Sequence, residues 1–270
     1  MWSVFFIWRS RIPSAAMIQV IYLMILKKRL LSQAVVLDLD GTLLHPDEEA
    51  IPVKGRSGYS YLSGKSAELL AEISRMIPLA IATGRNAKSV RNLTDQLDEV
   101  SFCGFVLENG LVVRTRLNSH SHAGKKDEWA EVASLLSCWE RLEGYEKCLG
   151  FVFPSSADDP ESVIREVLAR TGKKCHIYRE RHKIFVYPHY PGKLFGVREL
   201  GFEPLIAIGD ETNDLDMLRA CTYPATLSCA HENVRQCVEE RKGYCSRLRS
   251  HAATEDLLLW ANDVVRGHWV

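Results

Sequence analysis

The sequence lacks several features that would place it in a particular class of protein. No apolar run reaches the roughly 20 residues that a membrane-spanning helix needs, and Lys+Arg equals Asp+Glu at 34 each. The chain therefore has no overall charge to attract nucleic acid or a membrane surface. None of the eight cysteines forms a CxxC pair, so we expect reduced thiols rather than zinc ligands. No nucleic-acid partner and no stable membrane span are expected, and the oligomeric state is open.

Acidic residues are absent from the first 35 residues, which carry five basic residues and the apolar runs WSVFFIW and MIQVIYLMIL. This composition is typical of an organelle-targeting or signal-like extension. Alternatively, the start is assigned too early, because Met17 or Met24 would also begin the chain shortly before the first strand. Either way, residues 1–32 are predicted to lie outside the fold. We expect a cytoplasmic protein, or an organellar one if residues 1–32 are a presequence.

Beyond residue 33, short apolar segments alternate with amphipathic ones, as in a parallel sheet covered by helices on both faces. The segments 34–39, 79–83, 105–108 and 205–209 are predicted strands. Helices are predicted over 66–77, near 193–200 and over 254–265, where apolar residues recur at helical spacing. Residues 45–65 are polar and irregular, which predicts a flap or a loop.

Residues 113–188 break this alternation. A helix carrying Trp129 to Trp139, a second helix from Pro160 and closely spaced strands near 150–153, 175–179 and 183–187 indicate an inserted α+β unit with an antiparallel sheet. The predicted fold class is α/β, with a Rossmann-like parallel sheet core and a smaller α+β cap. The predicted divisions are 1–32 (extension), 33–112 (first core part), 113–188 (cap) and 189–270 (second core part).

Polar and acidic residues follow the predicted strands of the core. Ligands of parallel sheets bind beyond the carboxyl ends of the strands, so these residues are expected to share one edge. They are Asp38 and Asp40, then Thr83, Gly84 and Arg85, then Glu108 and Asn109, and finally the segment 209–214.

The close pair Asp38 and Asp40 requires a positive partner. Both side chains would point to the same side of a strand end, where their charges repel. Together with Asp210 they supply the hard oxygen ligands that Mg²⁺ prefers. Opposite such a metal, Thr83 would hold phosphate oxygens. Lys193 begins a predicted helix, where the macrodipole disfavours a cation, so it is expected to have an anionic partner.

Four motifs in this order resemble the haloacid dehalogenase superfamily of phosphotransferases: DLDGT at 38–42, ATGR at 82–85, a lysine at 193 and GDETND at 209–214. The similarity extends over about residues 33–265. Because the insert lies between the second motif and the lysine, the chain resembles the subgroup with a large α/β cap there. That subgroup includes sucrose-phosphate and trehalose-phosphate phosphatases and phosphomannomutase, which act mostly on phosphorylated sugars.

The resemblance implies catalytic and metal-binding roles for three aspartates. Asp38 would be the nucleophile that becomes an aspartyl-phosphate, and Asp40 would protonate the leaving alcohol and then activate water. Asp38, the backbone carbonyl of Asp40, and Asp210 would hold Mg²⁺.

The resemblance also implies how the phosphate is bound. Thr83 and Lys193 would neutralise and orient the transferring group, with Gly84 and Arg85 in the same turn. Asn213 would lie on the phosphate side of the site, and Asp214 would position Lys193 or a water molecule.

The resulting hypothesis is a Mg²⁺-dependent phosphatase for a small phosphomonoester of the sugar phosphate type. A sugar-phosphate mutase would use the same aspartates but return the phosphoryl group to the sugar. A non-catalytic binding protein on an inherited fold is the third alternative. Candidates for contact with the substrate are Glu108 and Asn109, at the rim facing the cap, together with Arg179, Glu180 and Lys183.

Overall fold

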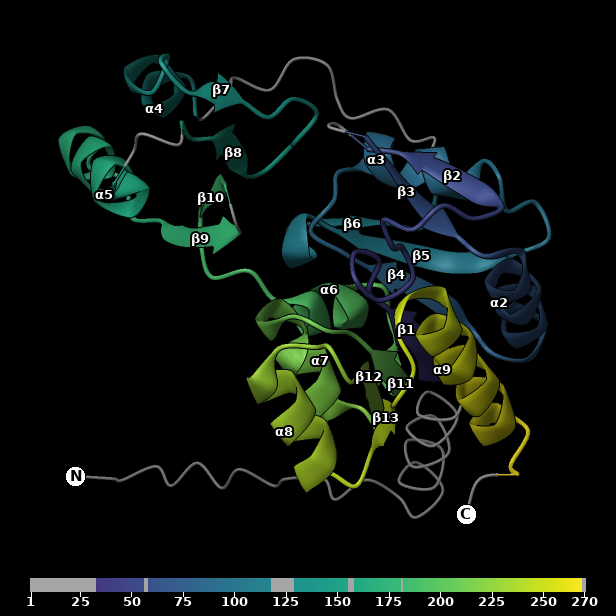
Figure 1. Cartoon of the computed structure of the whole chain (residues 1–270). Helices are drawn as coiled ribbons and strands as arrows, with labels where there is room; N and C mark the ends of the chain where they lie inside the picture. The colour runs from purple at the N-terminus through teal and green to yellow at the C-terminus, as the bar shows by residue number, and fades with distance from the viewer. Residues whose placement is uncertain (1–32, 56–57, 118–128, 155–157, 181, 269–270) are drawn as a thin grey trace, which may run out of the picture.

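The computed structural model describes residues 33–55, 58–117, 129–154, 158–180 and 182–268, and these are coloured in Figure 1. The expected N-terminal extension, residues 1–32, lies outside this range. Within the described residues, no helix combines the length and the apolar character needed to cross a bilayer.

A seven-stranded sheet forms the core, with the strand order β13-β12-β11-β1-β4-β5-β6. All neighbouring strands are parallel except β5 and β6, which are antiparallel. The strands are β1 Gln33–Leu37, β4 Leu79–Ala82, β5 Phe102–Leu107, β6 Val112–Arg114, β11 Glu203–Ile208, β12 Tyr223–Leu227 and β13 Tyr244–Ser246. Strand β1 lies between β11 and β4, so residues at the carboxyl ends of these three strands become neighbours.

Both faces of this sheet are buried. Along β1, Val35 and Leu37 pack into one apolar cluster, while Ala34 and Val36 pack into the other. Helices α2, α3 and α9 cover the first face, and α6, α7 and α8 cover the second. The helices are α2 Gly64–Met76, α3 Ala87–Thr94, α6 Lys193–Glu199, α7 Leu215–Ala220, α8 Glu232–Glu240 and α9 Ser250–Val265. Burial on both faces explains why these strands are continuously apolar.

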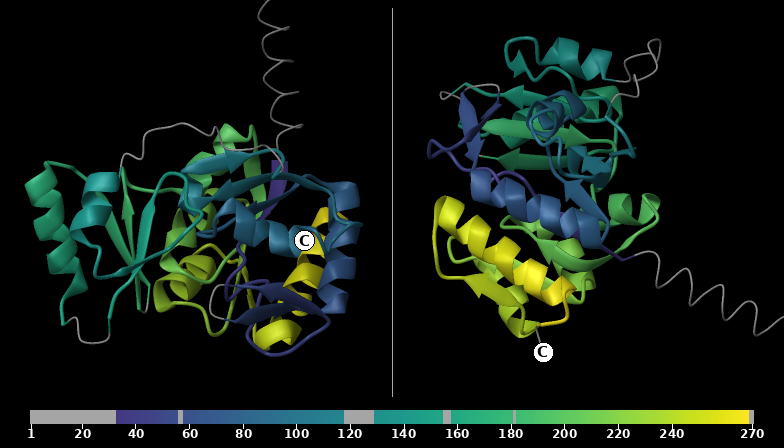
Figure 2. Two further views of the ribbon diagram at one scale, coloured as in Figure 1. Left: turned by 90° about the horizontal axis from the view of Figure 1, so that it is seen from above. Right: turned by 90° about the vertical axis from the view of Figure 1, so that its right-hand side faces the viewer.

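The cap is a separate layered unit with its own apolar core. Its antiparallel sheet has the order β7-β8-β10-β9, and the helices α4 and α5 pack on it through residues such as Val132 and Ile164. Its elements are α4 Ala130–Leu135, β7 Glu140–Arg141, β8 Leu149–Val152, α5 Pro160–Thr171, β9 His176–Glu180 and β10 Lys183–Tyr187. Figure 1 and the left view of Figure 2 show this unit beside the core. The predicted α/β core with an inserted α+β cap is confirmed.

Three local predictions were wrong. The stretch predicted to be irregular contains a hairpin of β2 Ile51–Lys54 and β3 Tyr59–Leu62, because Val53 and Leu62 are buried in the core. Strand β6 pairs with β5 up to Arg114, so the core sheet extends past residue 112. The first cap helix ends at Leu135, and Trp139 lies beyond it, where its ring packs against Phe151 and Phe153.

Candidate active site

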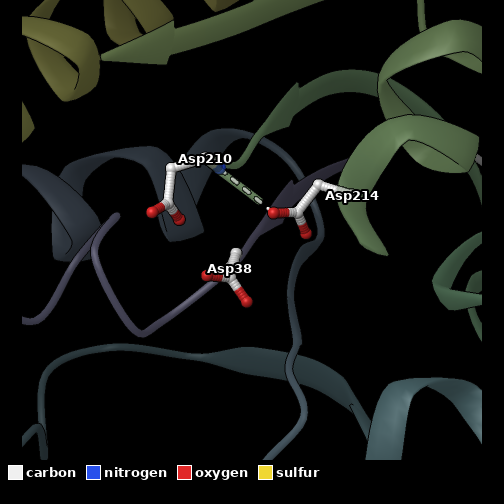
Figure 3. Close-up of side chains that lie close together, drawn as sticks. All are labelled: Asp38, Asp210 and Asp214. Atoms are coloured by element: carbon white, nitrogen blue, oxygen red, sulfur yellow. Dashed lines mark hydrogen bonds between the residues drawn. The ribbon is translucent and has the colours of Figure 1, made fainter. Parts of the chain in front are cut away.

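Asp38 follows β1 at the carboxyl edge of the sheet. Its backbone N–H donates to the carbonyl of Ile208 at 3.0 Å, which continues the β1–β11 ladder by one residue. Leu37 and Leu39 on either side are fully buried, so both neighbours of Asp38 are anchored in the core. The Asp38 side chain is itself buried and points toward Asp210 and Asp214 (Figure 3).

Lys193 reaches this carboxylate from the first residue of α6. Its Nζ donates to Asp38 Oδ1 at 2.6 Å and to Asp214 Oδ1 at 2.5 Å, and its side chain is 1% exposed. Burial alone would lower the pKa of Lys193, but the carboxylates of Asp214 and Asp38 outweigh burial and raise it above its ordinary value. The two carboxylates therefore favour the charged form of Lys193. Its predicted anionic partner exists within the protein as two aspartates.

Asp210 and Asp214 are fixed by short local bonds in the turn after β11. Asp214 Oδ2 accepts the backbone N–H groups of Asp210 and Glu211, both at 3.0 Å. Asp210 Oδ1 accepts the hydroxyl of Thr42 at 2.8 Å. Gly41, at φ 81°, brings the DLDGT turn close to this group, since a Cβ there would lie 2.3 Å from Asp210 Oδ2. A side chain at Gly41 would strain the backbone and displace the Asp210 carboxylate.

The carboxylates of Asp38, Asp210 and Asp214 suit a divalent cation. One oxygen of each lies within 4.8 Å of the others. Both oxygens of Asp214 are already bonded, whereas Asp38 Oδ2 and Asp210 Oδ2 receive no hydrogen bond from the described residues. Two available carboxylate oxygens match the one or two that Mg²⁺ takes from proteins. The donor set therefore fits Mg²⁺, with Asp38 and Asp210 as ligands and Asp214 behind them.

The electrostatics of the cluster also favour a bound cation. The cluster contains three carboxylates, and Lys193 supplies only one positive charge against them. Burial, reinforced by Asp214, raises the pKa of Asp210 to about 7. Burial likewise raises the pKa of Asp38, against the opposing effect of Lys193. A divalent ion favours the ionised forms of its ligands, so it would bring both pKa values down.

Asp40 lies apart from the cluster, at the mouth of the site. Arg85 holds its carboxylate with two bonds, from Nε to Oδ2 at 2.8 Å and from Nη2 to Oδ1 at 2.5 Å. The side chain of Asp40 is 55% exposed. Burial opposes ionisation, but the bonds and charge of Arg85 prevail and lower the pKa of Asp40. The metal contact predicted for Asp40 involves its backbone carbonyl and not this side chain.

Thr83 and Gly84 form the turn after β4, beside the cluster. Thr83 is 1% exposed, and its Oγ1 accepts the N–H of Arg85 at 3.2 Å, so its hydroxyl hydrogen remains available to donate. Gly84 lies against Asn109, since a Cβ on Gly84 would be 3.3 Å from Asn109 Oδ1. Asn109 in turn donates its backbone N–H to the carbonyl of Thr83 at 3.0 Å.

Asn213 contacts the same side chain from the turn after β11. Its Nδ2 lies 3.0 Å from Asn109 Oδ1, and Asn109 Nδ2 lies 2.8 Å from the hydroxyl of Tyr187 on cap strand β10. Three residues far apart in sequence thus form one chain from the active site to the cap. Asn213 Oδ1 is buried and has no hydrogen-bond partner among the described residues.

Glu108 joins the core to the cap through backbone groups. One oxygen accepts the N–H of Glu146 at 2.6 Å, and the other accepts those of Lys147 and Cys148 at 2.9 and 3.0 Å. Glu108 and Asn109 both adopt left-handed backbone conformations, with φ of 51° and 56°, which glutamate rarely does. Burial raises the pKa of Glu108 although the three N–H groups favour its ionised form.

The structure places most of the predicted site residues at one edge of the sheet. Asp38, Asp210 and Asp214 lie together, with Lys193 bonded to Asp38 and Asp214, and Asn109 links Thr83 to Asn213. Arg85 contacts Asp40 instead of forming part of the cluster. Sequence reasoning assigned no role to Thr42 or Tyr187. Thr42 is part of the DLDGT motif, but Tyr187 resembles any aromatic residue of a strand.

Comparison with known proteins agrees with this architecture. Residues 35–136 match the model of the family of haloacid dehalogenase-like hydrolases, while no curated protein matches the chain. A haloacid dehalogenase-like hydrolase from Bacteroides thetaiotaomicron superposes with a TM-score of 0.63 at 17% identity, covering 85% of this chain and 99% of that one. A sugar phosphatase of subclass IIB of the superfamily gives 0.57 at 17% identity, with 85% and 99% covered. A trehalose-6-phosphate phosphatase related protein gives 0.58 at 14% identity, with 87% and 99% covered. The predicted resemblance to the superfamily is confirmed.

Proposed function

We propose that this chain is a haloacid dehalogenase-like hydrolase, and that it is a Mg²⁺-dependent phosphatase that acts on a small phosphomonoester of the sugar phosphate type. The observation that carries the proposal is the state of Asp38. One of its oxygens is held by Lys193 and the other is unbonded among the described residues, next to Asp210. A buried carboxylate with one oriented, unbonded oxygen beside a cation site is suited to attack phosphorus. The sugar phosphatase and the trehalose-6-phosphate phosphatase related protein of the same fold support the substrate class.

The proposed reaction gives each of these groups a role. One carboxylate oxygen of Asp38 forms a bond to phosphorus while the bond to the ester oxygen breaks. The departing oxygen takes a proton from Asp40, which has to be protonated and released from Arg85 for this step. A water molecule then loses a proton to Asp40 and attacks the aspartyl-phosphate, which releases inorganic phosphate and restores Asp38. Lys193 and Thr83 hold the phosphoryl oxygens during both steps. Mg²⁺, held by Asp38, Asp210 and the carbonyl of Asp40, would supply further charge neutralisation.

Hydrolysis fits the surroundings of Asp40 better than transfer back to the sugar. A mutase has to keep water from its phosphorylated intermediate. The Asp40 side chain is 55% exposed, so water reaches the group that would activate it. We therefore favour the phosphatase over the mutase.

The direct test is phosphate release from a panel of phosphorylated metabolites. We expect turnover that stops with EDTA, returns with Mg²⁺ and is lost in Asp38→Asn. Asp263→Asn, an exposed aspartate of α9, is the matched control and is expected to retain full activity. Beryllofluoride should form an adduct on Asp38 in the wild-type protein. Turnover without metal, or an isomerised sugar phosphate without free phosphate, would contradict the proposal.

A further inference from the structure

The contact between cap residue Tyr187 and Asn109 offers a role for a residue that the reaction itself does not use. Tyr187 is 1% exposed, and its hydroxyl meets the Asn109 amide. The Asn109 amide lies against Gly84, at the turn that carries Thr83. It also meets the Asn213 amide. A cap residue thus reaches the predicted phosphate site through a single intermediate side chain.

The orientation of the two amides decides what Asn213 presents to the site. With Asn213 Nδ2 directed at Asn109 Oδ1, the buried oxygen of Asn213 is left without a partner. Such an oxygen is costly to bury, and on the phosphate side of the site, where the resemblance places Asn213, it would repel a phosphoryl oxygen. A half-turn of both side-chain amides exchanges the positions of Oδ1 and Nδ2 in each. The same contacts remain, but their donors and acceptors are reversed. The Tyr187 hydroxyl then donates to Asn109, Asn109 donates to Asn213 Oδ1, and the N–H₂ group of Asn213 is free to donate.

We propose that Tyr187 is a positioning residue, whose hydroxyl acts through Asn109 to hold the Asn213 amide with its N–H facing the transferring phosphoryl group. The proposal rests on the proposed function, because it assigns Asn213 to the phosphate of that reaction. The hydroxyl of Tyr187 both accepts and donates, so it permits either orientation by itself. The anion selects the donating one, and the relay keeps the carbonyl oxygen of Asn213 bonded in that state.

Two features of the surroundings support this relay. Burial raises the pKa of Tyr187 well above its ordinary value, so the hydroxyl keeps its proton throughout the physiological range. The carboxylate of Glu108 binds three backbone N–H groups of the cap, one residue before Asn109. The relay is therefore complete only when the cap lies against the core, which links closure of the cap to binding of the phosphate.

The test removes the hydroxyl oxygen of Tyr187, both in the wild-type protein and in an Asn213→Ala variant. Tyr187→Phe should lower kcat/KM by about tenfold, the effect of one lost hydrogen bond to a group that binds an anion. In an Asn213→Ala background the same substitution should change kcat/KM by less than about twofold, because a residue that acts only through Asn213 has nothing left to orient. Equal losses in both backgrounds, or no loss in the single variant, would overturn the proposal.

The control removes a comparable hydroxyl far from the site. Tyr244 donates to Asp256 at 2.8 Å between β13 and α9. Tyr244→Phe should leave kcat/KM unchanged, and thermal unfolding would show that both variants fold.

Binding of inorganic phosphate separates this proposal from the proposed function. Calorimetry in the presence of Mg²⁺ should show phosphate binding that weakens about tenfold in Tyr187→Phe but not in Tyr244→Phe. If phosphate binding is weakened in Tyr187→Phe but not in Tyr244→Phe, while the wild-type protein hydrolyses no ester, the relay stands and the proposed function fails. If hydrolysis occurs and phosphate binding is the same in all three proteins, the relay fails alone.

Discussion

The base of the active site and its junction with the cap are both buried, but they are held together by different groups. At the base, Asp38, Lys193 and Asp214 are charged side chains bonded to one another. At the junction, Glu108 binds backbone N–H groups and Tyr187 binds an amide. Charges buried at the base have to be balanced by other specific charges, so the identity of each residue is fixed. At the junction, Glu108 binds backbone N–H groups, which every residue except proline provides. The identity of the residues that donate them is therefore less restricted.

Replacing Lys193 tests the base and should have the largest effect. Lys193→Met keeps the length of the side chain but leaves two buried carboxylates without their cation. The free energy of unfolding should fall by about 3–5 kcal/mol, and phosphate release should be lost. Chemical denaturation measures the first effect. Lys65→Met, on the exposed face of α2, is the control and should change stability by less than about 0.5 kcal/mol.

Replacing Glu108 tests the junction. Glu108→Gln preserves the shape but turns an N–H₂ group toward backbone N–H groups that need an acceptor. We expect a loss of about 2–3 kcal/mol, because hydrogen bonds to a charged group are involved. Hydrogen exchange should show faster exchange of the amides of residues 146–148, while amides of β1 stay protected. Uniform acceleration in both regions would mean that the junction does not open independently of the base.

The buried His45 should make the stability of the protein depend on pH. Its Nε2 lies 2.7 Å from Thr254 Oγ1, which donates to the carbonyl of Thr42 at 2.6 Å, behind Asp210. Burial, together with nearby His251, lowers the pKa of His45 from 6.5 to about 4. Between these values the unfolded chain binds a proton that the folded protein does not, so stability is full above pH 6.5 and falls as the pH drops toward 4.

The matched experiment compares unfolding of the wild-type protein and His45→Gln across this pH range. The wild type should lose about 2 kcal/mol from this one group between pH 6.5 and pH 5. The variant should lose correspondingly less over the same interval. Parallel pH profiles for the two proteins would show that His45 is not the group responsible.

The smallest effect is expected from the ion pair at the edge of the junction. Arg114 of β6 binds Glu146 at 2.6 Å, and both side chains are 25% exposed. Arg114→Gln should cost less than about 1 kcal/mol, and this cost should shrink as salt is added. A loss as large as that of Glu108→Gln would mean that charge, rather than the backbone contacts, holds the cap.

Some of the site was predictable because its residue types are unusual where they stand. Aspartates directly after an apolar strand, and a lysine at the start of a helix, are unfavourable unless something compensates them. The roles of Asp38, Asp40 and Asp210 as nucleophile, acid and metal ligand stay predictions. By contrast, Glu108 was placed only at the rim, because a glutamate after a strand is equally suited to face water.

The sequence by itself determined the parallel sheet, the inserted cap and the acidic edge. Each of these depends on local patterns in the sequence. The strands are continuously apolar, the alternation of strands and helices stops after β5, and charged residues occupy strand ends and a helix start where they are unfavourable. Only the tertiary structure decided that Arg85 pairs with Asp40, that Thr42 bonds Asp210, and that Tyr187 reaches Asn213 through Asn109. These bonds join residues that are distant in sequence, and their partners are common polar or aromatic side chains. No local pattern distinguishes such a partner from any other residue of its type until folding brings the two together.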